Sequence, residues 1–226
     1  MFLVGRNEAK LAALERRLAE VSDSGDAPIA GRLAADLDDL EGNADRVQAG
    51  IDALGGLDIV LVAHGELGSQ LATEHDYRSA EAIFRTNFLS PVSLLVPIAN
   101  FFEAQGHGRI MVVSSVAGER GRPRNYTYGS AKGALTLYLQ GLRSRLWSRG
   151  IEIHTIKLGP VVTPMTHDHP KNRLFAEAPE VADQLVALLG RRGGEHYVPR
   201  YWRPIMAIVR LLPEPLFQRF SFLAGR

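Results

Sequence analysis

Residues 109–115 read Arg-Ile-Met-Val-Val-Ser-Ser, and residues 128–132 read Tyr-Gly-Ser-Ala-Lys. The first segment is a short apolar run that predicts a buried strand ending at Ser115, and the second opens a predicted helix. Four residues are about one helical turn, so Lys132 is expected on the same helix face as Tyr128. The three side chains are therefore expected to meet at one end of a sheet.

This arrangement suits proton exchange with a carbonyl or alcohol oxygen. An ammonium group favours the phenolate form of a nearby tyrosine, so Lys132 is expected to lower the pKa of Tyr128 from its free value of about 10. Tyr128 would then exchange a proton with a substrate oxygen near neutral pH, while Ser115 hydrogen-bonds the same oxygen. Taken alone, the pentad also fits a tyrosine packed on a helix face beside a solvated lysine.

Short apolar runs alternate with amphipathic segments, which predicts strands alternating with helices around a parallel sheet. Strands are predicted at 2–4, 29–35, 57–63, 110–114, 151–158 and 195–198, and helices at 7–21, 41–54, 77–105, 126–149 and 181–189. Pro91 is expected to bend the long helix. The order is that of a doubly wound α/β fold, whose ligands bind at the carboxyl ends of the strands.

Composition bounds the remaining choices. The chain has 226 residues, 46% of them hydrophobic and 23% charged, as expected for one globular domain. Its net charge of +1 gives no reason to expect a nucleic-acid partner. The absence of cysteine excludes disulfides, thiolate metal sites and a cysteine nucleophile. No apolar stretch of membrane-spanning length and no signal peptide stand out, so a cytoplasmic location is expected.

A Gly-Pro turn follows the predicted strand 151–158, and with it the chain resembles the short-chain dehydrogenase/reductase family over nearly its whole length. The resemblance implies a Rossmann-like fold and an NAD(P)-dependent oxidoreductase. It implies that Tyr128 donates the proton, that Lys132 adjusts the pKa of Tyr128 and that Ser115 orients the carbonyl. Asn87 matches the asparagine that holds a water behind the lysine as a proton relay, although a buried, satisfied helix asparagine is the alternative. No metal is implied.

The resemblance also assigns cofactor positions. Gly5-Arg6 stands where other members carry an acid, which favours NADP over NAD, unless Arg6 is simply solvated. Asp36 and Leu37 match a contact to the adenine, with helix capping by Asp36 as the alternative. Gly65 would keep the backbone close to the adenosine ribose. The other positions implied to bind the cofactor are Tyr128, Lys132, Pro160, Val161 and Thr163.

Two departures from the family pattern concern the adenosine half of the site. Residues 62–65 read Val-Ala-His-Gly and lack the usual asparagines, and His64 is interpreted as a loop residue rather than a base. The family's Gly-x-x-x-Gly-x-Gly turn is absent, and residues 2–7 resemble its second strand, so about thirty residues would be missing. Two apolar strands would then face each other across a gap. Either translation is assigned to an internal methionine, or the chain is a natural truncation that would lack a cofactor site.

Residues 63–68, 114–120 and 197–206 resemble a narrower branch, bacterial reductases of decaprenylphosphoryl-2-keto-β-D-erythro-pentose. That likeness implies a lipid-linked sugar substrate used in cell-wall synthesis. The basic cluster of Arg120, Arg122 and Arg124 would then meet a lipid phosphate, with a solvated basic loop as the alternative.

We therefore expect an oxidoreductase domain at 1–199 and an amphipathic segment at 200–226. Apolar residues edged by arginines in that segment suit a helix lying on an anionic membrane, and packing on its own domain or at a subunit interface is the alternative. The resemblance implies a homo-oligomer formed through the helices around Asn87 and Tyr128. Two other functions stay open: reduction of an unrelated ketone or alcohol, and a non-catalytic subunit or peripheral membrane module.

Overall fold

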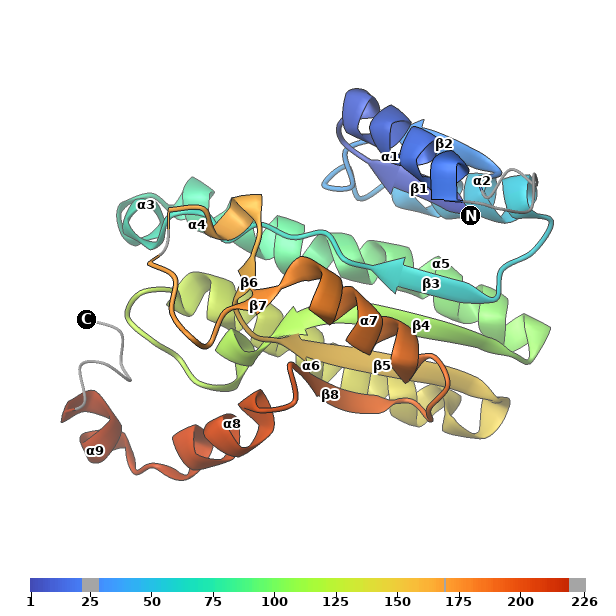
Figure 1. Ribbon diagram of the computed structural model, residues 1–226. Helices are drawn as coiled ribbons and strands as arrows, with labels where there is room; N and C mark the ends of the chain where they lie inside the picture. The colour runs from blue at the N-terminus through green and yellow to red at the C-terminus, as the bar shows by residue number, and fades with distance from the viewer. Residues whose placement is uncertain (22–28, 169, 220–226) are drawn as a thin grey trace.

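The computed structural model describes residues 1–21, 29–168 and 170–219. Their elements follow in Figure 1 in the order β1 Phe2–Gly5, α1 Glu8–Val21, β2 Gly31–Ala34, α2 Asn43–Leu54, β3 Ile59–Val62, α3 Gln70–His75, α4 Tyr77–Phe84, α5 Ser90–Gln105, β4 Gly108–Ser115, α6 Tyr126–Leu146, β5 Ile151–Leu158, β6 Val161–Val162, β7 Ala176–Glu177, α7 Ala178–Leu188, β8 Gly194–Val198, α8 Trp202–Leu211 and α9 Glu214–Arg219.

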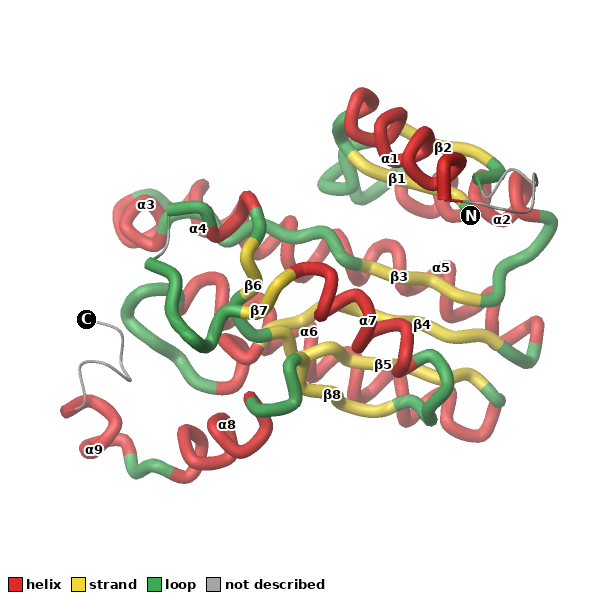
Figure 2. The backbone as a smooth tube through the Cα atoms, viewed as in Figure 1, coloured by secondary structure: helices red, strands yellow, loops and turns green. Residues whose placement is uncertain are grey.

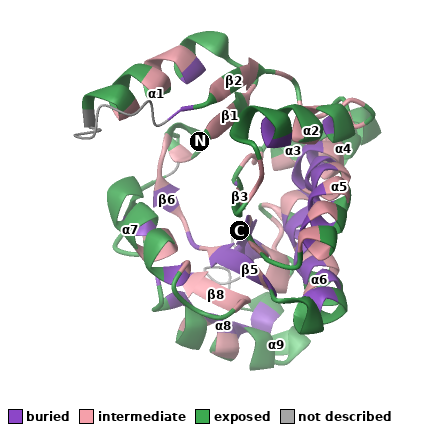
Figure 3. Cartoon of the chain, turned by 90° about the vertical axis from the view of Figure 1, so that its right-hand side faces the viewer, coloured by how far each residue is buried: buried purple, intermediate pink, exposed green. Residues whose placement is uncertain are grey.

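The main sheet is parallel and has the strand order β3-β4-β5-β8 (Figure 2). Helices α5 and α6 cover one face of it and α7 covers the other, as Figure 3 shows from the end of the molecule. The arrangement confirms the predicted doubly wound α/β fold. Parallel strands covered on both faces read as continuous apolar runs, which is why β4 and β5 could be recognised in the sequence.

β4 and β5 form the centre of the core. They pair along their whole length, from Gly108 opposite Ile151 to Ser115 opposite Leu158. The cluster between this sheet and its helices contains side chains with no exposed surface: Leu95, Phe102, Ile110, Val112, Leu135, Leu139, Leu146 and Ile153. This packing fixes the carboxyl ends of β4 and β5, where the site lies.

β1 and β2 form a separate two-stranded sheet, set apart from β3 in Figure 1. Within the described residues, β1 is hydrogen-bonded only to β2 and β3 only to β4. Val4, Ile59 and Leu61 on these strands are 38%, 45% and 54% exposed, which is unusual for the apolar strands of such a sheet. The expectation of two apolar strands that do not pair is confirmed.

Side chains on helices, rather than strand pairing, hold the β1–β2 unit in place. The Asn43 amide of α2 donates to the Ser93 hydroxyl of α5 at 2.6 Å. The Ser90 hydroxyl, also on α5, donates to the Leu37 carbonyl at 2.7 Å. The loop after β2 is thereby kept beside the loop after β3.

The predicted helix over 77–105 is one continuous helical run, Tyr77–Gln105, but its irregularity does not lie at Pro91. The structure has α4, a π-helical turn at Arg85–Leu89, and then α5. The irregular turn precedes Pro91, which lies in the first turn of α5 where a missing N–H costs little. The run Tyr77–Gln105 is also long and apolar enough to cross a membrane, although the sequence was expected to contain no stretch of that length. Half of the most apolar part of this run is buried in the fold.

α8 and α9 pack against the turn that follows β4. The buried side chains in this contact are Val116, Trp202, Met206, Val209 and Phe217. Residues 202–217 thus follow the alternative in which the C-terminal segment packs on its own domain. Three apolar side chains remain on the outside, namely Ile208, Leu211 and Leu216. The predicted membrane-facing residues Phe220, Phe222, Leu223 and Arg226 lie outside the described residues.

Candidate active site

Glycines bring the turn after β4 onto the first turns of α6. This turn is a 3-10 helix, Val116–Glu119. A Cβ added to Gly118 would lie 2.6 Å from the Gly133 nitrogen, and one added to Gly129 would lie 2.8 Å from the Ala117 carbonyl oxygen. Both distances are shorter than carbon can approach backbone atoms, so only glycine allows this packing. As a result, Ser115 and Tyr128 lie at the same end of the sheet.

Ser115 is buried at the last position of β4. Its hydroxyl accepts a bond from the Ala117 amide at 3.1 Å and donates a long one, 3.4 Å, to the Leu158 carbonyl. The hydroxyl also hydrogen-bonds Tyr128, so the two hydroxyls lie together where a ligand oxygen can meet both. Its location at a strand end agrees with the prediction.

Tyr128 is half-buried and lines a cavity of about 600 Å³, bounded by the residues 67–71, 73, 74, 123–125 and 127. Burial raises the pKa of its phenol above the ordinary value, and a hydrogen bond with Ser115 acts in the opposite direction. The expectation that the pKa is lowered is therefore wrong. Burial disfavours the phenolate more than the neighbouring groups favour it. The phenol keeps its proton at neutral pH and can donate it.

Lys132 lies one turn further along α6, as predicted. Its Nζ donates to the Val113 carbonyl at 3.0 Å and lies 5.9 Å from the centre of the Tyr128 ring. The residue is 3% exposed, and burial lowers its pKa from 10.5 to about 8. The spacing in the sequence correctly predicted the shared face, but gave no indication of this burial.

Asn87 lies in the π-helical turn and binds the loop after β3. Its amide donates to the carbonyls of Glu66 at 2.7 Å and Ile83 at 2.9 Å, and its Oδ1 accepts from the Glu66 amide at 3.1 Å. π-turns are frequent at functional sites because they redirect a side chain. Asn87 is thus buried with its amide and carbonyl groups hydrogen-bonded, as the structural alternative to a proton relay expected. A role in a proton relay stays a prediction.

Gly65 lies beside the side chains of both Asn87 and Lys132. A Cβ at this position would lie 2.8 Å from the Asn87 Oδ1 and 3.2 Å from the Lys132 Nζ. The structure therefore brings three of the predicted residues into one place. Glycine at position 65 lets the Asn87 and Lys132 side chains approach the backbone this closely, because any Cβ there would force one of them to shift.

His64 is a neutral structural residue. Its Nε2 lies 2.9 Å from the Ser90 hydroxyl, which donates its only proton to the Leu37 carbonyl, so the histidine must donate. Burial, and then the charge of Lys132, lower its pKa to about 4. A histidine with so low a pKa is a poor base, in agreement with the interpretation from sequence.

The predicted adenosine contacts lie at the ends of β1 and β2. Arg6 is exposed and close enough to contribute to the lowered pKa of His64. The Asp36 carboxylate accepts a bond from the Asp38 amide at 3.1 Å, which forms a local turn. It does not cap a helix as the alternative expected, because α2 begins only at Asn43 with Gly42 as its N-cap. The Leu37 carbonyl accepts bonds from both Ser90 and Asn43.

The predicted nicotinamide contacts follow β5. The Pro160 carbonyl accepts from the Ala176 amide at 3.1 Å, and Val161 is buried in β6, which pairs with β7. Thr163 begins a 3-10 turn at Pro164–Thr166. Because Ser115 lies opposite Leu158, this segment leaves the sheet next to Ser115.

α3, which was not predicted, covers the start of α6. Its Thr73 hydroxyl lies 2.9 Å from the Thr127 hydroxyl, and its Gln70 accepts from the Thr127 amide at 3.1 Å. One signal was present: the Ser69 hydroxyl caps the helix by accepting from the Ala72 amide. α3 forms one wall of the cavity beside Tyr128.

The three clustered arginines have different roles. Arg120 donates to carbonyls at the end of α8, and the half-buried Arg122 contacts the Met206 sulfur and has a pKa lowered by burial. Arg124 is exposed and lines the cavity with Tyr128. The idea that all three meet one phosphate is therefore wrong, and only Arg124 faces the cavity.

Comparison with known proteins gives consistent matches. The family described as "short chain dehydrogenase" matches residues 1–174. An uncharacterized oxidoreductase of Streptomyces coelicolor is 35% identical over 170 residues, which are 74% of this chain and 66% of that protein. One from Mycobacterium tuberculosis is 33% identical over 184 residues, 81% of this chain and 74% of the other.

Solved structures share the fold. A Thermococcus sibiricus alcohol dehydrogenase complexed with 5-hydroxy-NADP is 17% identical with a TM-score of 0.75, over 87% of this chain and 83% of that one. A Burkholderia cenocepacia gluconate 5-dehydrogenase in complex with NADP and tartrate is 20% identical with a TM-score of 0.73, over 87% and 82%. With the family match, the sequence relatives and the grouping of Ser115, Tyr128 and Lys132, the chain belongs to the short-chain dehydrogenase/reductase family.

Proposed function

We propose that this protein is an NADP-dependent reductase that transfers a hydride to a keto group. The observation that carries the proposal is the meeting of Ser115, Tyr128 and Lys132 beside a cavity large enough for a small substrate. Pockets of this size that hold a few convergent polar groups are typical of substrate sites.

Each side chain has a role that follows from its surroundings. The Ser115 hydroxyl, which hydrogen-bonds Tyr128, orients the substrate carbonyl. Tyr128 keeps its proton because burial raises its pKa, so it can donate that proton to the oxygen being reduced. Lys132 supports the phenol from the same helix face, and Asn87 holds the loop that packs against the lysine.

The cofactor fits this site at its nicotinamide end. When bound, NADPH supplies the hydride. Gly65 would keep the backbone close to the adenosine ribose, and a Cβ added there would lie too close to the Asn87 Oδ1 and the Lys132 Nζ. Tyr128, Pro160, Val161 and Thr163 would hold the nicotinamide end.

The adenosine end fits less completely. Arg6 at the end of β1 suits a 2′-phosphate, and Asp36 with Leu37 would contact the adenine. NADP in the two solved relatives supports the choice of cofactor. The sequence contains no Gly-x-x-x-Gly-x-Gly, so the pyrophosphate has no glycine-rich turn here.

We further propose a lipid-linked keto-sugar as the substrate, used in cell-wall precursor synthesis at the cytoplasmic face of a membrane. Arg124 at the cavity suits an anionic group near the reacting carbon. The exposed side chains of Ile208, Leu211 and Leu216 suit contact with lipid. A homo-oligomer assembled through α4 to α6 is part of the same proposal.

Three experiments test the proposal. Fluorescence titration with NADPH should show saturable binding, and the protein should oxidise NADPH when given a lipid-linked ketopentose more efficiently than with simple ketones. Absence of NADPH binding would leave a non-catalytic role as the better account. Turnover of simple ketones only would keep the reductase and reject the lipid-linked substrate. Co-sedimentation with anionic vesicles, compared between the wild type and Leu211→Glu, tests the membrane contact.

A further inference from the structure

The turn that carries Ser115 is held at its far end by two consecutive charged residues, Glu119 and Arg120. We propose that these are positioning residues, which fix the Ser115 hydroxyl by binding its turn to the sheet and to the C-terminal helices α8 and α9. The inference rests on the proposed function in one respect, the role of Ser115 in orienting a carbonyl.

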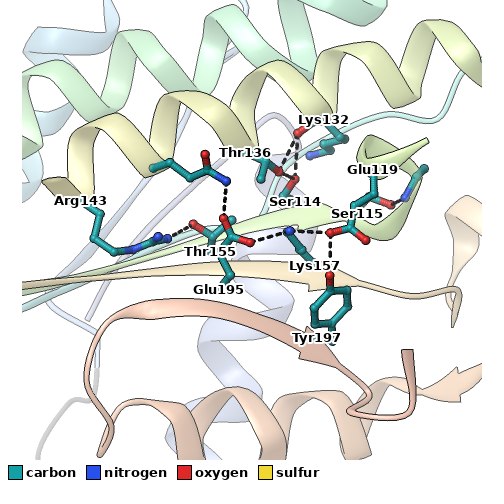
Figure 4. Close-up of polar contacts among 12 residues, drawn as sticks. Ser114, Ser115, Glu119, Lys132, Thr136, Arg143, Thr155, Lys157, Glu195 and Tyr197 are labelled. Atoms are coloured by element: carbon teal, nitrogen blue, oxygen red, sulfur yellow. Dashed lines mark hydrogen bonds and ion pairs between the residues drawn. The ribbon is translucent and has the colours of Figure 1, made fainter. Parts of the chain in front are cut away.

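Glu119 binds the turn to β5 and β8. Its Oε1 accepts from the Lys157 Nζ at 2.5 Å and from the Tyr197 hydroxyl at 2.7 Å. Lys157 also contacts the Glu195 carboxylate at 2.6 Å, so three elements join in one network (Figure 4). The side chains of Glu119 and Lys157 are each 5% exposed. A buried ion pair of this kind resists opening, because losing one partner leaves the other charge uncompensated.

Lys157 keeps its charge in this network. Burial by itself would lower its pKa, but hydrogen bonds to Glu119 and Glu195 outweigh that effect and raise the pKa above the ordinary value. Glu119 therefore faces a permanent cation at physiological pH. The link between the turn and the sheet does not depend on a titration near neutrality.

Arg120 binds the turn to the C-terminal helices. Its guanidinium donates to the carbonyls of Val209 at 2.7 Å and Leu212 at 2.6 Å, where α8 ends, and to the Glu214 carboxylate at 2.8 Å. Its central carbon lies 4.1 Å from the centre of the Phe217 ring. One side chain thereby caps α8, contacts α9 and holds the end of the Ser115 turn.

The contact between turn and helix retains polar atoms that stability alone would not favour. Four buried side-chain polar atoms in the described residues have no hydrogen-bond partner, and three of them flank this contact: Glu119 Oε2, Arg122 Nε and Trp202 Nε1. Leaving such an atom without a partner costs stability. Unsatisfied groups of this kind are expected where geometry serves function.

The consequence for Ser115 follows from its own bonds. Its hydroxyl accepts the 3.1 Å bond from Ala117, donates the weak 3.4 Å bond to Leu158 and hydrogen-bonds Tyr128, and Ala117 belongs to the same turn. A displaced turn would therefore carry the hydroxyl with it. Small misplacements of an orienting group lower the rate of chemistry more than the binding of substrate.

A double-mutant cycle tests the inference. Arg120→Ala and Glu119→Gln should each lower kcat about tenfold with little change in KM, and neither should have a further effect in a Ser115→Ala background. Arg120→Lys, which keeps the charge but fewer donors, should recover part of kcat. Arg143→Ala is the matched control, because Arg143 is also half-buried and donates to Ile153 and Thr155 away from the turn.

Amide hydrogen exchange gives a readout that needs no activity. Residues 115–120 should exchange faster in Arg120→Ala than in wild type or Arg143→Ala. The inference would be overturned if residues 115–120 exchanged equally fast in Arg120→Ala and Arg143→Ala. It would also be overturned if Arg120→Ala or Glu119→Gln lowered kcat as much in the Ser115→Ala background as in the wild type. If the wild type reduces no ketone, the proposed function fails, and exchange alone then decides whether the turn is held as described.

Discussion

The Lys132 ammonium lies 5.9 Å from the centre of the Tyr128 ring, and its hydrogen bond goes to the Val113 carbonyl at 3.0 Å. Both groups are in an environment that disfavours charge, so the pKa of the tyrosine is raised and that of the lysine falls to about 8. The Tyr128 phenol is protonated, and Lys132 is charged only below about pH 8. A protonated phenol can donate the proton that reduction of a carbonyl requires. We expect reduction to be faster than alcohol oxidation at neutral pH.

The low pKa of Lys132 predicts how stability depends on pH. Its pKa is about 8 in the folded protein and 10.5 in the unfolded chain, so between these values the unfolded state binds more protons. Stability contributed by this site therefore rises with pH across that window, by up to about 3 kcal/mol. Urea unfolding of wild type and Lys132→Met at pH 7.5 and 10 measures it. A difference in free energy of unfolding that stays constant with pH would contradict this prediction.

Gly65→Ala should lower activity without unfolding the protein. The added methyl would lie 2.8 Å from the Asn87 Oδ1 and 3.2 Å from the Lys132 Nζ, so one of them must shift. We expect kcat/KM to fall about tenfold or more and NADPH to bind more weakly. Gly141→Ala in α6 is the control, since nothing lies within 4 Å of its added Cβ. Alanine there should raise stability by about 0.5–1 kcal/mol. Equal activities of the two variants would argue against a role for Gly65.

Arg124→Ala should separate anionic from neutral substrates. Arg124 is the arginine of its cluster that lines the cavity, so its loss should raise KM for a phosphate-bearing ketone about tenfold and leave a neutral ketone unaffected. Arg124→Lys should recover part of the loss. Steady-state kinetics with both substrates check this. A similar change in KM for each would show that Arg124 does not distinguish anionic from neutral substrates.

The sequence was informative where one local pattern determined the structure. β5 was predicted over the residues it occupies, and α6 began at Tyr126 as expected, because a buried strand and a long helix each impose a clear periodicity. The shared face of Tyr128 and Lys132 followed from spacing alone. β6 and β7, which have two residues each, are too short to leave such a pattern.

Features that depend on distant contacts could not be predicted. The pKa of Tyr128 was expected to fall but is raised, because burial is a property of the folded chain. The ion pair between Glu119 and Lys157 joins residues 38 positions apart. The bonds from Arg120 to α8 span about ninety residues, so the arginine was interpreted as a phosphate ligand. The π-helical turn around Asn87 has no distinct sequence signal and was read as part of one helix.

The proton donated by Tyr128 is the central claim, and Tyr128→Phe tests it most directly. The variant keeps the ring that packs beside Lys132 and removes only the hydroxyl. NADPH consumption with a ketone substrate should fall by about a hundredfold or more, while thermal unfolding stays close to that of the wild type. A Tyr128→Phe protein that consumes NADPH at the wild-type rate would show that the proton comes from elsewhere.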